Sequence, residues 1–159
     1  MNPIIHNMSF TDAGLTGTGA ETVYDTANTL TYAIDGVLKA KTAVTDGVTP
    51  TTDINTGAAF NAVLPDQACL LLWLINAAGT VAMAQGDIVD VDGDTDDLKN
   101  PAQFPIAPAG YAPFAYTLFQ TDGTSSAGGL LPGTSNWNAT GLTATHREIA
   151  FIPSRPILA

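Results

Sequence analysis

One turn between two strand-like runs most constrains how this chain can fold. Asp35 and Gly36 separate residues 29–34, where Leu, Tyr and Ile alternate with smaller or polar residues, from the run at 37–44. Asp-Gly at this place favours a type I′ turn, because both central residues of that turn need a positive φ. The segment therefore predicts a β-hairpin over residues 29–44.

The rest of the chain repeats short strand-like runs and turn residues, with almost no helical periodicity. The most apolar run, residues 69–75, has no polar alternation, which is typical of a strand covered on both faces. We expect it to return as residues 80–85 after a turn at 76–79. Further elements are predicted as strands at 114–119, 136–145 and 147–152, a short helical turn at 58–63, and a mobile Gly/Ser-rich loop at 121–133.

Length and composition favour a single all-β domain. A chain of 159 residues can bury a normal core without disulfides or metals. Only 13% of residues are charged, and polarity comes from Thr, which favours strands, and from Asn, Asp and Gly, which favour turns. We expect a β-sandwich or small β-barrel of antiparallel strands over residues 21–159. Residues 1–20, rich in Gly and Thr, predict a flexible or extended N-terminal arm outside the core.

The charge argues against two classes of partner. The chain has 5 Lys and Arg against 15 Asp and Glu, a net charge of −10. Binding to nucleic acid phosphates or to an anionic membrane surface requires clustered basic residues. Residues 1–8 show no secretion signal, and the apolar run at 68–84 is short for a transmembrane span and is interrupted by turn residues. We expect neither nucleic acid nor a membrane among the partners.

The residues that most often carry catalysis form no recognisable site. Cys69, the one cysteine, lies inside the apolar run and is interpreted as an inert core residue. His6 and His146 lack metal-ligand spacing to each other or to Cys69. The triplet formed by His146, Arg147 and Glu148 is interpreted as an exposed, partly ion-paired start of a strand. The sequence thus predicts a non-enzymatic protein with no catalytic residue, metal ligand or cofactor.

The acidic segment 87–97, which includes the acidic loop 92–97, is the one cluster that could carry chemistry. Calcium binds six to eight oxygen ligands, and the carboxylates of Asp87, Asp90, Asp92, Asp94, Asp96 and Asp97 could supply several. In an EF-hand beginning at Asp92, the required Gly and Glu positions are held by Asp97 and Gln103. We interpret the loop as a solvated acidic turn, and calcium binding there stays open as an alternative.

Most aromatic side chains are expected in the core, with one exception. Trp137 is flanked by polar turn residues and is predicted to be an exposed contact. A large exposed aromatic ring suits an interface anchor as well as a platform that stacks on sugars, where Tyr111 could assist it.

Several segments resemble small structural proteins encoded in the head-gene modules of tailed bacteriophages. The likeness covers about residues 24–153. It lies in these segments: Thr31-Tyr-Ala-Ile-Asp-Gly36, Lys39-Ala-Lys41, Thr51-Thr-Asp-Ile-Asn-Thr-Gly-Ala-Ala-Phe60, Leu74-Ile-Asn-Ala-Ala-Gly-Thr-Val81, Pro101-Ala-Gln-Phe-Pro-Ile-Ala-Pro108, Pro113-Phe-Ala-Tyr116 and Ser135-Asn-Trp-Asn-Ala-Thr-Gly141.

The resemblance implies a virion structural protein, specifically a capsid decoration or cement protein on the outer shell. Such proteins are often trimers at local symmetry axes, so the implied partners are the major capsid protein and two further copies of the chain. The implied location is the virion, assembled in the host cytoplasm. The family offers no catalytic residues to carry over.

Two other functions stay open. The chain could be a tail, neck or fibre-base adaptor of the virion. It could also be a carbohydrate-binding module that uses Trp137, Tyr111 and calcium at the acidic loop 92–97. A β-fold hydrolase comes last, because no acid–base pair stands out.

Overall fold

The described part of the chain is built from antiparallel β-strands. The computed structural model describes residues 7–17, 19 and 22–149, and no helix capable of crossing a membrane occurs among them. The strands are β1 (Met8–Ser9), β2 (Leu15–Gly17), β3 (Val23–Thr26), β4 (Leu30–Ile34), β5 (Val37–Lys41), β6 (Val44–Val48), β7 (Gln67–Asn76), β8 (Val81–Gln85), β9 (Val89–Asp90), β10 (Tyr111–Thr121) and β11 (Leu142–Glu148).

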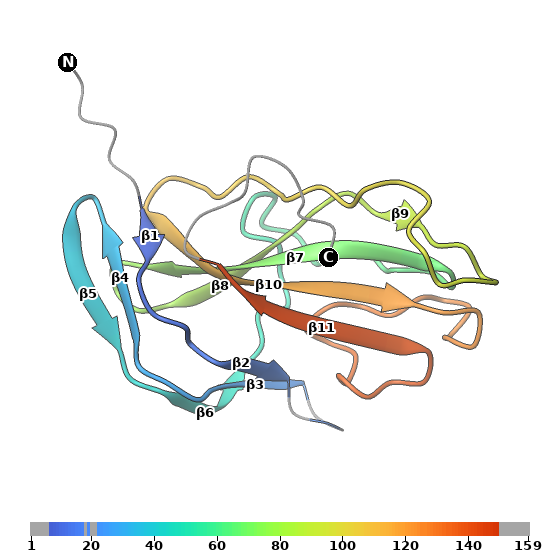
Figure 1. Cartoon of the computed structure of the whole chain (residues 1–159), viewed down its shortest axis with the longest axis horizontal. Helices are drawn as coiled ribbons and strands as arrows, with labels where there is room; N and C mark the ends of the chain where they lie inside the picture. Colours follow the sequence, from blue (N-terminus) through green and yellow to red (C-terminus); the bar gives the residue numbers. More distant parts are fainter. Residues whose placement is uncertain (1–6, 18, 20–21, 150–159) are drawn as a thin grey trace, which may run out of the picture.

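The first six strands form one bent layer. β1 pairs with β4 and β4 with β5, while β2 pairs with β3 and β3 with β6. β1 and β2 follow each other in one direction, and β3 and β4 run antiparallel beside them. β5 and β6 then run antiparallel to β4 and β3. The two three-stranded sheets are therefore halves of a single three-strand meander, drawn in blue and cyan in Figure 1. We call this layer the meander.

The second layer is the sheet β11-β10-β7-β8, with β9 paired to the start of β7. β7 and β10 are its long central strands, and the meander lies along one side of them (Figure 1). The main core lies between the layers. Its largest buried side chains include Tyr32 from the meander and Leu71, Trp73, Ile75, Met83, Phe114 and Phe119 from the second layer.

The outer face of the second layer is covered as well. Leu72 and Leu74 of β7 form a smaller cluster there with Ala82 and Ala84 of β8. Side chains such as Phe104, from the proline-rich segment 100–113, pack over that cluster. Since β7 is buried from Ala68 to Ile75, the predicted strand with two covered faces is confirmed.

Two predicted hairpins are confirmed. β4 and β5 meet at Asp35 and Gly36, whose φ angles are +52° and +77°. Both values lie in the left-handed region that a type I′ turn requires. β7 returns as β8 after the turn at residues 77–80, where Gly79 has a φ of +79°.

The expected sandwich is present, and none of the three sheets closes into a barrel within the described residues. β2 and β11 approach each other at the side where closure would occur. No backbone ladder joins them, because side chains of β11 bind the backbone of β2 instead.

Two predictions of local structure are wrong. Residues 58–63 form no helical turn; Ala59 and Val63 instead make isolated β-bridges to Thr52 and Leu130. The two predicted C-terminal strands are one strand, β11, and residues 136–140 before it form turns. Residues 150–152 of the second predicted strand lie outside the described residues.

The predicted arm is partly described. Residues 7–17 include β1 and β2, which pair with β4 and β3 and form one edge of the meander. Contrary to the expectation that this segment stays outside the core, Ala13 and Leu15 are buried in it. Residues 1–6, 18 and 20 of the arm lie outside the described residues. The loop 121–133 also packs inward, since Leu130 is buried and bridges to Val63.

Candidate functional site

Trp137 is buried, which corrects the prediction of an exposed contact. Only 7% of its surface is exposed, and its ring centroid lies 6.3 Å from that of Trp73 and 6.4 Å from that of Phe119. Its Nε1–H donates to the carbonyl oxygen of Val23 at 2.8 Å. The indole therefore fixes the loop before β11 to the meander, and its face is not free to stack on a sugar.

Gly17 lies flat against this indole. A Cβ atom at position 17 would sit 2.6–2.7 Å from the ring atoms of Trp137, closer than any side chain can approach. The residue is thus required by close packing. No sequence pattern predicts this contact, because Gly17 stands among other glycines in the predicted arm.

His146 is half-buried and belongs to a chain of polar contacts across the second layer. It lies opposite Thr117 in the pairing of β11 with β10, and its Nδ1 is 2.7 Å from Thr117 Oγ1. The same oxygen accepts a hydrogen bond from Trp73 Nε1 at 2.8 Å. On the other side of the ring, Nε2 of His146 accepts the backbone N–H of Gly17 at 3.1 Å.

These contacts fix the tautomer of His146. A backbone N–H can only donate, so Nε2 must be the unprotonated nitrogen. The proton is therefore on Nδ1 and is donated to Thr117. Burial lowers the pKa of His146 to about 4, so the imidazole is neutral near pH 7.

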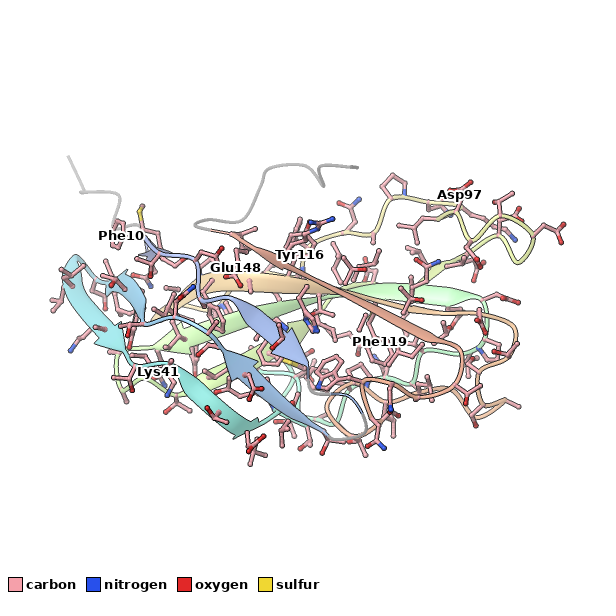
Figure 2. All side chains as sticks on the ribbon, turned by 60° about the horizontal axis from the view of Figure 1, so that its bottom comes forward. Phe10, Lys41, Asp97, Tyr116, Phe119 and Glu148 are labelled. Atoms are coloured by element: carbon pink, nitrogen blue, oxygen red, sulfur yellow. The ribbon has the colours of Figure 1, made fainter. Side chains whose placement is uncertain are left out.

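Glu148 points inward from the same face of β11. Its two carboxylate oxygens accept the backbone N–H groups of Ala13 at 3.3 Å and Leu15 at 2.7 Å. Burial raises the pKa of Glu148, and these two hydrogen bonds oppose the rise. Figure 2 shows Glu148 between the blue N-terminal segment and the strands β10 and β11.

Together these contacts form a latch. The N–H groups of Ala13, Leu15 and Gly17 all point to the side of β2 away from β3, and β11 satisfies them with two side chains. We call Glu148, His146 and the three N–H groups the β11 latch. The prediction that His146 and Glu148 are exposed and ion-paired is therefore wrong. Since their acceptor atoms already bind the backbone, the arrangement serves to hold the layers together.

The inward orientation of His146 and Glu148 can be predicted from the sequence. Leu142, Ala144, His146 and Glu148 alternate with polar residues, so all four occupy one face of a strand. Two apolar members of that face predict that it is the inner one. The partner N–H groups, by contrast, lie about 130 residues earlier and carry no signal of their own.

The acidic loop 92–97 is a hydrogen-bonded turn at one end of the sandwich. Asp92 N–H donates to the carbonyl oxygen of Asp97 at 2.8 Å, and an oxygen of the Asp92 side chain accepts the N–H of Asp94 at 2.9 Å. Across the described residues, no three His, Cys, Asp or Glu side chains gather in a way that could hold a metal ion. The loop thus satisfies its own backbone.

Cys69 is an inert core residue, as predicted. Its side chain is fully buried on the inner face of β7, and burial raises the pKa of the thiol to about 11. At neutral pH it is a thiol and not the nucleophilic thiolate.

An exposed apolar face lies over β1, β4 and β5. Met8 is opposite Ala33, which is opposite Leu38, so these side chains share the outer face. Phe10 continues this face, since its N–H donates to Thr31 and Thr31 lies opposite Ala40. Leu38 is 67% exposed and Phe10 55%. Ala33, between Met8 and Leu38, is itself buried, with 8% of its surface exposed. We call Met8, Phe10, Ala33, Leu38 and Ala40 the contact face.

β5 also has an open edge. It is the last strand in the order β1-β4-β5, and no other described strand pairs with its far side. Lys39 and Lys41, two of the five basic residues in the chain, lie opposite Tyr32 and Leu30 and therefore on the other face of β5 from Leu38. Figure 2 shows Lys41 and Phe10 at one end of the molecule and Asp97 at the opposite end. The open edge of β5 therefore has the contact face on one side and two lysines on the other.

Comparison of the chain with protein-family models, with curated proteins and with solved structures gives no match.

Proposed function

We propose that this protein is a non-enzymatic structural component of a bacteriophage head, a decoration protein that binds the outer surface of the shell and stabilises it by bridging shell subunits. The single observation that carries the proposal is the contact face beside the open edge of β5. Exposed Leu38 and Phe10 offer apolar area, and the open edge offers unpaired backbone groups. The resemblance to head-module structural proteins supports the same function.

The chemistry of this region defines the partner. Apolar side chains of the major capsid protein would cover Leu38 and Phe10, and an extended segment could add to the edge of β5. Lys39 and Lys41 would pair with carboxylates on that segment. Electrostatic complementarity of this kind gives register and specificity more than affinity.

The size of the contact face favours a trimer. Strands lie ~4.8 Å apart and rise ~3.3 Å per residue, so three strands of about five residues cover on the order of 200–300 Å². A stable interface buries roughly 800 Å² on each partner. One contact face is too small alone, whereas a homotrimer would present three faces and gain avidity from linked binding.

Co-sedimentation with shells of the major capsid protein that lack this chain tests the proposal. We expect the wild-type protein to bind and Leu38→Asp to bind at least ten-fold more weakly. Ile106→Asp is the matched control, because Ile106 is 81% exposed but lies in the proline-rich segment 100–113. If the wild-type protein fails to bind, or if both variants bind equally well, the proposal is wrong.

The copy number in purified particles separates the shell from other positions. Quantitative mass spectrometry against the major capsid protein should give near-stoichiometric amounts for a decoration protein. A dozen copies or fewer would instead indicate a tail, neck or fibre-base adaptor. The carbohydrate-binding alternative is not proposed, because Trp137, the residue on which it depended, is buried.

A further inference from the structure

We infer that the β11 latch is an acid-sensitive switch: protonation of His146 detaches Gly17, and with it β2, from β11. The inference concerns a conformational change within the chain, and it does not depend on the proposed function. It starts from the hydrogen bonds of His146 and from the side of β2 on which the latch lies.

The latch satisfies backbone groups that have no other partner strand. In the antiparallel pairing of β2 with β3, Thr16 is opposite Asp25, and Leu15 and Gly17 flank this pair. Since successive N–H groups of a strand point to opposite edges, those of Leu15 and Gly17 face away from β3. Glu148 and His146 take the place of a neighbouring strand on that edge.

A second proton on His146 cannot fit the existing contacts. Nδ1–H already donates to Thr117 Oγ1, so an added proton must go to Nε2. There it would face the N–H of Gly17, whose nitrogen is 3.1 Å away. Two donors would then point at each other, and the Gly17 N–H would lose its acceptor. The imidazolium would also be partly removed from water at this half-buried site, which raises its free energy.

The surroundings of His146 are uncharged on the elements packed against it. β10 presents Thr117, β2 presents the backbone of Gly17, and the loop before β11 presents the ring of Trp137, with centroids 5.2 Å apart. The ionisable groups of the latch region are Glu148 on β11 and Asp12 before β2. Burial alone accounts for the lowered pKa of His146.

Glu148 responds to acid in the opposite sense. Its pKa is raised, so protonation removes a charge whose burial is unfavourable. Protonation of one carboxyl oxygen would weaken one of its two bonds, to Ala13 or Leu15, and leave the other in place. The bond of the latch that protonation turns into a contact between two donors is therefore the one between His146 and Gly17.

The direction and size of the pH effect follow from the two states of His146. The pKa is about 4 when the latch is closed and returns toward 6.5 when it opens, so the open form binds the proton more tightly. Lowering the pH from 7 to 5 should therefore raise the opening equilibrium constant about twenty-fold. Above pH 7 the imidazole is neutral in both states and the effect disappears.

Amide hydrogen exchange of the full chain, followed by NMR and corrected for the intrinsic pH dependence of exchange, tests this inference. Between pH 7 and 5 we expect the protection factor of the Gly17 amide to fall about twenty-fold. The amides of Leu71 and Leu72 in β7 should keep their protection, because they report opening of the core. In His146→Gln, whose side-chain oxygen can accept the Gly17 N–H and does not titrate, Gly17 should show no such fall.

Three outcomes would overturn the inference. Constant protection of Gly17 in the wild-type protein would show that the latch stays closed in acid. An equal loss at Gly17 and at the β7 amides would indicate global unfolding. The same pH dependence in folded His146→Gln would place the titrating group elsewhere. The comparison of Gly17 with β7 in the wild-type protein can still overturn the inference even if the variant does not fold.

Discussion

The meander has two outer edges, one covered by side chains of β11 and the other left unpaired. At the β2 edge, Glu148 and His146 bind the outward N–H groups of Ala13, Leu15 and Gly17. At the β5 edge, no described strand or side chain replaces the missing neighbour, and Leu38 is exposed beside it. An unpaired strand edge is a template for pairing with another chain, so proteins usually cover it. The covered edge therefore belongs to the fold, whereas the open edge is available to a partner.

Lys39 and Lys41 of β5 suit an open edge that must not pair with identical copies, and they also suit an edge that binds a partner. Lysine side chains on an edge strand discourage nonspecific pairing between identical sheets. They also select a partner segment that carries carboxylates. Changes at the covered edge should thus reduce stability, and changes at the open edge should reduce binding alone.

The largest loss of stability is expected at Trp137, which supports the covered edge. Trp137→Ala removes the ring that packs on Gly17, Trp73 and Phe119, and truncation of a buried Trp costs ~3–5 kcal/mol. Urea denaturation measures this change. Trp137→Phe keeps most of the apolar area and loses the hydrogen bond to Val23, so it should cost clearly less. Equal, negligible costs for both variants would contradict the burial of this residue.

Glu148→Ala should have the next largest effect. It leaves the N–H groups of Ala13 and Leu15 without their acceptor, and an unsatisfied buried donor costs ~1–3 kcal/mol. The matched control is Arg147→Ala, on the outer face of the same strand, which should change the free energy of unfolding by less than ~0.5 kcal/mol. Equal effects of the two substitutions would mean that the latch contributes nothing to stability.

A smaller loss is expected at the tip of the hairpin that carries the open edge. Gly36 has a φ of +77° and no heavy atom near the position of an added Cβ. Gly36→Ala should therefore cost ~1 kcal/mol through backbone strain alone. Thermal denaturation of this variant and of Gly17→Ala should rank Gly17→Ala as much the worse, because there a Cβ would overlap the indole of Trp137.

The smallest effect on stability is expected at Leu38. Leu38→Ser changes a side chain that is 67% exposed, so the free energy of unfolding should stay within ~0.5 kcal/mol of the wild-type value. Urea denaturation checks this directly. A loss above ~2 kcal/mol would mean that the contact face is part of the fold and not a free surface.

Local chemistry made much of the fold predictable. Asp35 and Gly36 specify a turn through the φ angles that they tolerate, and the strand 69–75 is specified by its unbroken apolar character. The inert character of Cys69 followed from the same apolar run. The prediction of a helical turn at 58–63 was wrong because the bridges to Thr52 and Leu130 impose an extended backbone.

By itself the sequence determined the all-β class, the two hairpins and the covered central strand, because these depend on residues close together in the chain. Only the tertiary structure decided that Trp137 is buried, that Gly17 packs on it, and that β11 closes the β2 edge with side chains and so leaves a sandwich. The reason is distance along the chain. Trp137 binds Val23 from 114 residues away, and His146 binds Gly17 from 129 residues away, so no local pattern could reveal either contact.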